Sequence, residues 1–115
     1  MFLLTNAVRG YAWGSHRQLA DFQGRTPSGA PEAELWIGAH HGDPSRLPDT
    51  RPLNEVIAAA PAATLGDAVD LAFEGRLPFL MKVLAVEEPL SLQVHPSPDQ
   101  ARLGHARETV RGIPV

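Results

Sequence analysis

The sequence predicts a mainly β protein with short helices. Ten glycines and eleven prolines occur in 115 residues, well above the average share of these two residue types, which indicates many turns between short elements. Two segments, AELWIG and PLSLQVH, alternate with the two-residue period of a strand. Apolar residues make up 43% of the chain and charged residues 20%, as in a globular protein of at most one domain.

Residues 1–48 have the pattern of short strands separated by turns. The segments FLLTNAV and AELWIGAH are strand candidates, and the turn-rich GYAWGSH lies between them. In AELWIG the alternation places Glu34, Trp36 and Gly38 on one face and Leu35 and Ile37 on the other. This strand therefore has one aliphatic face and one mixed face.

A helical insertion is expected near residues 52–75. The segment LNEVIAAA predicts a short helix that follows Pro52 and ends at Pro61, because proline lacks an amide donor and clashes with the preceding turn. The segment TLGDAVDLAFEG predicts a second short helix, with Asp67 as its N-cap and Gly75 as its stop.

The apolar density rises from Leu77 onward. The segments PFLMKVLAV and PLSLQVH predict two strands joined by a turn at Glu87, Glu88 and Pro89. The next segment, SPDQARLGHARETVR, predicts an exposed helix that is capped by Ser97 or Asp99 and runs up to Gly112.

Bulk properties exclude several classes of partner and compartment. The net charge is −3 and no block of basic residues occurs, so nucleic acid is not an expected partner. The chain has no cysteine, which excludes disulfides and thiolate metal sites and makes the cytoplasm the default compartment. The N-terminal apolar run, Phe2 to Leu4, is too short for a signal peptide, and no stretch approaches the roughly 20 apolar residues of a membrane span.

The stretch SLQVHPSPDQ, residues 91–100, contains a candidate metal site. In a strand, Ser91, Gln93 and His95 share one face, and the α-carbons of Gln93 and His95 lie about 7 Å apart. An imidazole nitrogen and an amide oxygen form a mixed donor set that zinc accepts. The alternative is that His95 ends an edge strand and makes only local hydrogen bonds, since two donors alone do not make a metal site.

Lys82 and Glu34 are charged residues within apolar strands. Lys82 is either a half-buried amine that serves as a base or substrate anchor, or an edge-strand lysine whose ammonium group stays in water. Glu34 is either solvated on an open face or held inside a pocket, and the solvated arrangement is the commoner one.

The remaining tryptophan and the other histidines give weaker signals. Trp13 in YAWG is either a core residue, a cap over a turn or, less often, a wall for a sugar ring. His40 and His41 are adjacent in a loop, so we expect their side chains to diverge rather than share a metal. His16 and His105 lie in polar contexts and are expected at the surface. The sequence has no dinucleotide-binding, P-loop, hydrolase or zincin motif.

Four blocks of the sequence occur together in the order known from one family. They are YAWGS at 11–15, AELWIGAH at 33–40, PFLMKVL at 78–84 and PLSLQVHPSPDQA at 89–101. The ordered set resembles the N-terminal part of type I mannose-6-phosphate isomerase, from about Asn6 onward. One departure is His41, where the family commonly has proline.

The resemblance implies a fold and an activity. The fold is a cupin-type double-stranded β-sandwich, or jelly roll, and residues 1–115 would form the N-terminal part of that catalytic domain. The activity is the interconversion of mannose 6-phosphate and fructose 6-phosphate with one bound zinc. Gln93 and His95 are implied as two of the zinc ligands.

The resemblance also implies the other site residues. Lys82 and Glu34 would be catalytic, with Lys82 supplying positive charge or proton transfer and Glu34 positioning hydroxyls or moving protons. Trp13 and Ser91 would contact the substrate.

Two further zinc ligands of the family, a glutamate and a histidine, would lie beyond Val115. Gln93 and His95 alone would be half of the donor set, without its anionic member. We therefore expect a segment of a longer isomerase that is inactive by itself. The rival hypothesis is a short, non-catalytic cupin-like module that binds a sugar or a partner protein, which a stable, cooperatively melting chain would favour.

Overall fold

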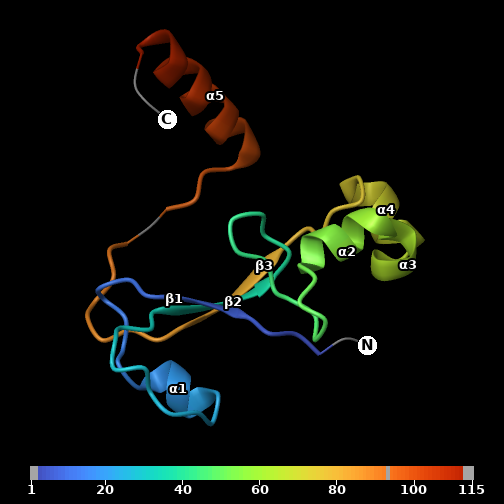
Figure 1. The fold of residues 1–115 in the computed structure, drawn as a ribbon. Helices are drawn as coiled ribbons and strands as arrows, with labels where there is room; N and C mark the ends of the chain where they lie inside the picture. Colours follow the sequence, from blue (N-terminus) through green and yellow to red (C-terminus); the bar gives the residue numbers. More distant parts are fainter. Residues whose placement is uncertain (1–2, 93, 113–115) are drawn as a thin grey trace.

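A small antiparallel sheet forms the centre of the computed structural model, which describes residues 3–92 and 94–112 (Figure 1). Its strands are β1 (Ala7–Arg9), β2 (Glu34–Gly38) and β3 (Leu80–Leu84), in the order β1-β2-β3. The predicted strands at AELWIG and PFLMKVL are thereby confirmed, as is the presence of short helices. The described residues nevertheless contain more helix than strand, so the expected excess of β structure is not seen in them.

Strand β2 separates the core from the opposite face of the sheet. Leu35 packs with Leu19 and Ala85 in a buried cluster, against which Ile37 and Val83 also pack. The aliphatic face predicted for AELWIG is therefore the core face, as the two-residue period of a strand requires.

A short helix, α1 (Gln18–Phe22), was not expected within residues 1–48. Its Leu19 and Ala20 are buried, whereas no side chain caps its first turn. Five residues are too few to show a helical period, and isolated helices of this length are unstable in water. The helix therefore depends on the packing of Leu19 against Leu35, a contact distant in sequence.

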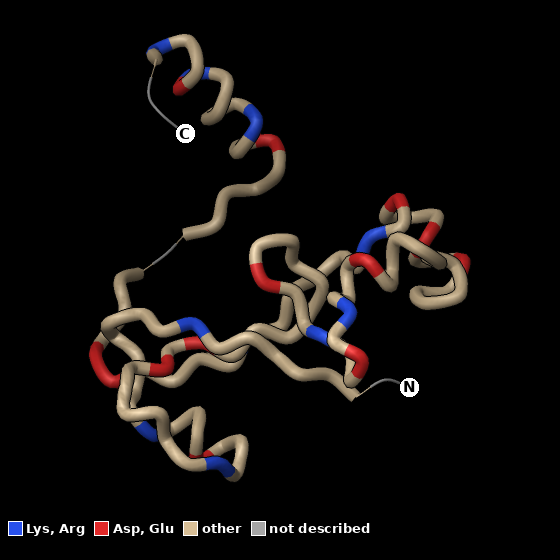
Figure 2. Tube along the Cα trace, in the orientation of Figure 1, with Lys and Arg blue, Asp and Glu red and all other residues tan. Residues whose placement is uncertain are grey.

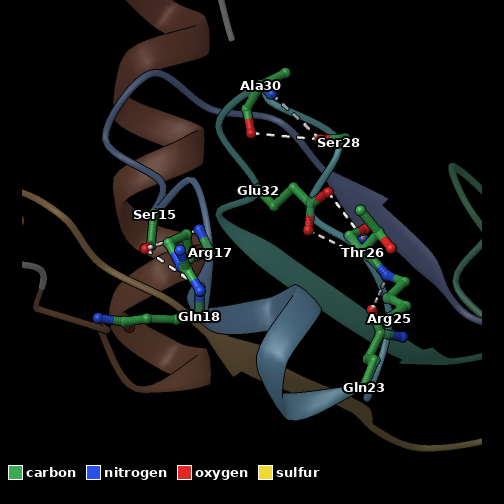
Figure 3. Close-up of polar contacts among 9 residues, drawn as sticks. All are labelled: Ser15, Arg17, Gln18, Gln23, Arg25, Thr26, Ser28, Ala30 and Glu32. Carbon is green, nitrogen blue, oxygen red and sulfur yellow. Dashed lines mark hydrogen bonds and ion pairs between the residues drawn. The ribbon is translucent and has the colours of Figure 1, made fainter.

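An ion pair between the exposed Arg25 and the buried Glu32 fixes the loop between α1 and β2 (Figure 3). The Arg25 guanidinium donates to both carboxylate oxygens of Glu32, at 3.1 Å and 2.5 Å, and Glu32 is only 5% exposed. Hydrogen bonding to Arg25 is the main cause that lowers the pKa of Glu32, with a further contribution from Ser28. The backbone of Glu32 pairs with Ser15, so the ion pair also holds the turn before α1.

Three helices, rather than the two predicted, follow the loop after β2. They are α2 (Leu53–Ala59), α3 (Pro61–Leu65) and α4 (Asp67–Phe73). The helix expected after Pro52 is confirmed as α2, and its Leu53 and Ile57 pack with Leu47 in a second buried cluster. This cluster lies apart from the core under β2.

The boundaries of these helices differ from the expected ones. Pro61 follows α2 as predicted but also starts α3, because the first turn of a helix does not need its missing amide donor. Gly66, with φ 83°, precedes α4 as its N-cap, so the prediction of Asp67 as the cap is wrong. Helix α4 ends at Phe73, and Glu74 and Gly75 both have positive φ, which agrees with the predicted stop.

The strand predicted for PLSLQVH is wrong for its described residues. Ser91, Leu92, Val94 and His95 belong to no strand, and Leu92 is 94% exposed. Alternation identifies the two faces of an extended segment but not a neighbouring strand, and an extended segment becomes a strand only when its backbone groups are paired. The described strands leave one edge of β3 without such a partner.

Helix α5 (Pro98–Val110) stands away from the sheet at the end of this extended segment (Figure 1). Ser97 and Gln100 form a reciprocal capping box, which confirms Ser97 as the predicted cap. The helix buries no residue, as its polar sequence predicts. Acidic and basic residues are interspersed along the trace (Figure 2). Within residues 3–92 and 94–112, no helix has both the length and the apolar character needed to span a bilayer.

We predict that Glu32→Gln makes the free energy of unfolding less dependent on pH in the acidic range. Folding lowers the pKa of the Glu32 carboxyl. The stability that the ionised Glu32 contributes is therefore complete above its unfolded pKa of about 4.3, and it is lost as pH falls through the lower pKa of the folded state. Glu32→Gln should therefore lower the free energy of unfolding at pH 7 and flatten its decline below about pH 4.3. Urea unfolding followed by circular dichroism at several pH values measures both effects.

The matched control is Glu74→Gln. Glu74 also pairs with an arginine, Arg76, but both side chains are about four-fifths exposed, at 82% and 77%. This variant should leave the pH dependence nearly unchanged, because exposed pairs contribute little. Equal effects of the two substitutions would contradict the role given to Glu32.

Candidate functional site

The mixed face of β2 carries a charged cluster. In the antiparallel register Trp36 lies opposite Lys82, and Glu34 lies two residues away on the same face. The Lys82 Nζ atom is 3.2 Å from Oε2 of Glu34, and the indole Nε1–H of Trp36 donates to that same oxygen at 2.6 Å. The cluster therefore joins two residues predicted to be catalytic to a third that was not.

Glu34 is buried, contrary to the expectation of a solvated carboxylate. It is 8% exposed, and the ammonium of Lys82 and the indole of Trp36 replace the water that a carboxylate would otherwise bind. The sequence showed an acidic residue among apolar ones but not the two donors, because Lys82 is brought from a strand about 50 residues further on.

Lys82 combines the two arrangements expected for it. It lies on edge strand β3 and its side chain is 37% exposed, but its ammonium is bound to Glu34 rather than free in water. The ammonium also lies 4.5 Å from the centre of the Trp36 ring, within the range of a cation–π interaction.

A cavity of about 340 Å³ lies next to this cluster. Its lining includes Trp13, Glu34 and Ser91, together with Leu84, Pro89 and Leu90. Three residues predicted as site residues from separate parts of the sequence therefore meet at one cavity, and Lys82 is joined to them through Glu34.

The YAWGS turn holds Trp13 at the cavity. Gly14 is bridged to Val86, and the amide of Glu87 donates to the carbonyl of Trp13 at 2.9 Å. A side chain at Gly14 would place its β-carbon 2.6 Å from the α-carbon of Ala33, so the turn approaches β2 at a distance that only glycine permits. Tyr11 stacks on Trp13, with ring centroids 5.6 Å apart.

Sequence reasoning missed Arg9 as part of the cluster. Its guanidinium carbon lies 4.6 Å from the centre of the Trp36 ring, and its Nε is 3.3 Å from Asp43. Arg9 pairs with Glu34 in the β1–β2 register, so it shares the face of Glu34 and Trp36. The alternation of AELWIG indicated that face, but nothing in the short β1 sequence indicated its register.

The histidines of the loop after β2 are arranged differently from the prediction. The rings of His40 and His41 do not diverge but stack, with centroids 4.4 Å apart, and the amide of Gly42 donates to Nδ1 of His40 at 3.1 Å. Adjacent side chains can meet in this loop because it lacks the alternation of a strand. His16 and His105 are exposed, as expected.

Only one of the two predicted metal ligands lies within the described residues. His95 is exposed and does not line the cavity next to Glu34, and Gln93 lies outside the described residues. Within the part of the chain that the structure describes, no group of three or more His, Asp or Glu side chains could hold a metal ion. One exposed imidazole does not fit a complete zinc site, so zinc binding would need donors besides the described residues.

A known family matches the part of the chain that contains the sheet, the YAWGS turn and the Glu34–Lys82 cluster. The chain matches the family "Phosphomannose isomerase type I, catalytic domain" over residues 1–111 and belongs to that family.

Relatives from bacteria and mammals resemble the chain over most of its length. It is 44% identical to the mannose-6-phosphate isomerase of Escherichia coli K12, in an alignment that covers 97% of this chain and 30% of that protein. It is 37% identical to the Homo sapiens mannose-6-phosphate isomerase, with 91% of this chain and 28% of the human protein covered. The chain thus spans less than a third of the length of these relatives.

Solved structures share the fold. The Salmonella typhimurium mannose 6-phosphate isomerase bound to the substrate f6p and to zinc matches with a TM-score of 0.86 and 44% identity, covering 96% of this chain and 29% of that chain. The apo form of the same enzyme matches with a TM-score of 0.85 and 45% identity, over 96% and 28% of the two chains. The described arrangement of strands and helices is therefore that of the family.

We predict that Gly14→Ala destabilises the protein and displaces Trp13. The added β-carbon would overlap the backbone of Ala33, and overpacking of this kind costs about 1–3 kcal/mol. Urea unfolding and the tryptophan emission spectrum measure the two effects. The control is Gly104→Ala in α5, where an added β-carbon meets no atom within 4 Å. Equal stabilities of the two variants would contradict the close approach at Gly14.

Proposed function

We propose that residues 1–115 are the N-terminal part of a cupin-type catalytic domain that interconverts mannose 6-phosphate and fructose 6-phosphate. The observation that carries the proposal is the meeting of Trp13, Glu34 and Ser91 at one cavity beside Lys82. Membership of the family, and the likeness to a relative bound to f6p and zinc, support this substrate class.

The charged cluster has the groups that aldose–ketose isomerisation requires. The reaction moves a proton between two neighbouring carbons while negative charge develops on the adjacent oxygen. In our proposal the ammonium of Lys82 supplies positive charge or a proton, and the carboxylate of Glu34 accepts a hydrogen bond from a substrate hydroxyl or moves protons.

The neutral residues of the cavity would hold the sugar. The Trp13 ring offers a flat apolar face on which the C–H groups of a sugar can pack, and the hydroxyl of Ser91 can donate to or accept from a sugar hydroxyl. Both residues line the cavity together with Glu34, so a bound sugar could contact all three.

We further propose zinc as the metal, with Gln93 and His95 as two of its ligands. Their neutral donors are of the kind that zinc accepts, but the remaining ligands would have to come from outside residues 1–115. When bound, zinc would act as a Lewis acid on substrate oxygen. The relatives bound to zinc support this choice of metal.

A chimera tests the activity and the role of His95. Residues 1–115 would replace the matching 30% of the Escherichia coli relative. We expect the chimera to convert mannose 6-phosphate to fructose 6-phosphate, to lose activity with a chelator and to regain it with zinc. His95→Ala should lower kcat/KM by at least about 100-fold, more than the loss of a residue that only orients a ligand.

The matched control for His95 is His105→Ala on the exposed α5, which should keep full activity. Activity that survives both chelation and His95→Ala would contradict the zinc proposal. The 115-residue chain alone should be inactive. A chain that melts cooperatively and binds mannose 6-phosphate without converting it, combined with an inactive chimera, would support a non-catalytic binding module instead.

Substitutions in the same chimera test the catalytic pair. Glu34→Gln and Lys82→Met should each lower kcat by roughly 10²–10⁴-fold, as expected for groups that transfer protons or stabilise developing charge. Because the two side chains form one ion pair, the double variant should lose less than the product of the single losses. Steady-state kinetics measure these values. The exposed Glu74→Gln is the control, and an unchanged kcat in Glu34→Gln would remove Glu34 from the mechanism.

A further inference from the structure

Trp36 contacts every charged group of the cluster on the mixed face of β2. Its Nε1–H donates to Oε2 of Glu34 at 2.6 Å, and its ring lies 4.5 Å from Nζ of Lys82 and 4.6 Å from the guanidinium carbon of Arg9. The alternation of AELWIG predicts the face on which Trp36 lies, but it does not predict these three contacts.

The two cations reach Trp36 from opposite sides of its strand. Arg9 is on β1 and Lys82 is on β3, the two strands that flank β2. Arg9 is in turn tied to Asp43 at 3.3 Å. The indole is therefore held between neighbours on both sides, and cation–π contacts with partly desolvated cations are stronger than those at exposed sites.

The contacts of Glu34 are confined to one carboxylate oxygen. Both Lys82 and Trp36 contact Oε2, and Oε1 makes no hydrogen bond or ion pair among the described residues. Two donors on one oxygen fix the rotation of the carboxylate and leave Oε1 as the oxygen available to a substrate hydroxyl. Glu34 lines the cavity, whereas Trp36 is buried and does not line it.

We propose that Trp36 is a positioning residue that sets the orientation of Glu34 through its indole N–H and that of Lys82 through its ring, with Arg9 holding the ring in place. The inference rests on the proposed function of Glu34 and Lys82. It predicts that Trp36 acts on the reaction although it does not touch the substrate.

Two substitutions separate the contributions of the N–H and the ring. Trp36→Phe keeps an aromatic face for Lys82 and Arg9 but removes the donor to Glu34. Trp36→Leu removes both the donor and the ring, with an aliphatic side chain in place of the indole.

The position of Lys82 can be measured in the 115-residue chain itself. Lys82 is the single lysine of the sequence, so methylation of amines with a ¹³C label gives one side-chain signal besides that of the N-terminus. Because its ammonium lies 4.5 Å from the indole centre, the ring should shift the methyl proton signals upfield. The shift should decrease in Trp36→Phe and disappear in Trp36→Leu.

The matched control for this measurement is Trp13→Leu, which removes the other tryptophan, on the YAWGS turn. It should preserve the upfield shift of the Lys82 signal. A signal at the same position in the parent chain and in Trp36→Leu would overturn the proposed contact of Lys82 with Trp36.

Kinetics of the chimera test the effect on the reaction. Trp36→Phe should lower kcat by about 10-fold or more, as for loss of a group that orients a functional residue, with a smaller change in KM and a shifted pH profile of kcat. An unchanged kcat and pH profile in Trp36→Phe would show that the indole N–H only supports the fold. An inactive parent chimera would count against the proposed function. In that case the methyl signal of Lys82 would still show whether Lys82 contacts Trp36.

Discussion

The register between β2 and β3 fixes both the core of the sheet and the charged cluster on its other face. It places Trp36 opposite Lys82 on one face of the sheet and Leu35 opposite Val83 on the other. Side chains alternate along a strand, so a slip of one residue would move Leu35 out of the core and Glu34 into it. The packing of the core and the assembly of the charged cluster are therefore consequences of the same hydrogen-bond ladder.

A second constraint ties the N-terminal turn to that ladder. The YAWGS turn is bridged to Val86, just after β3, and to Glu32, just before β2. Gly14 allows the turn to lie against Ala33, and the ion pair of the buried Glu32 with Arg25 holds the adjoining loop. Trp13 lies at the cavity because these backbone bridges place its turn there, and not because of the local sequence around Trp13.

The residues of the charged cluster contact one another, whereas the proposed metal ligands form no site among the described residues. Glu34, Lys82 and Trp36 are held by contacts within the sheet, each from a paired strand. His95, in contrast, lies in an extended segment whose described residues are exposed and pair with no strand. An alternating sequence presents a defined face only when its backbone is paired in a sheet. The charged cluster therefore has a fixed geometry. His95 belongs to no comparable cluster of described residues.

By itself, the sequence determined the local features of this protein. Two-residue alternation set the faces of β2, proline and glycine set the ends of the helices near residues 52–75, and Ser97 capped α5, because each depends on neighbours within a few residues. The burial of Glu34, the place of the Trp13 turn and the helix at Leu19 depend instead on contacts between distant segments of the folded chain. Glu34 and Leu19 have partners far away in the sequence, and the place of the Trp13 turn depends on strand bridges that no local pattern reveals. The family resemblance assigned Glu34, Lys82 and Trp13 to one site in advance, but the contacts of Arg9 and Trp36 became visible only once the strands were paired.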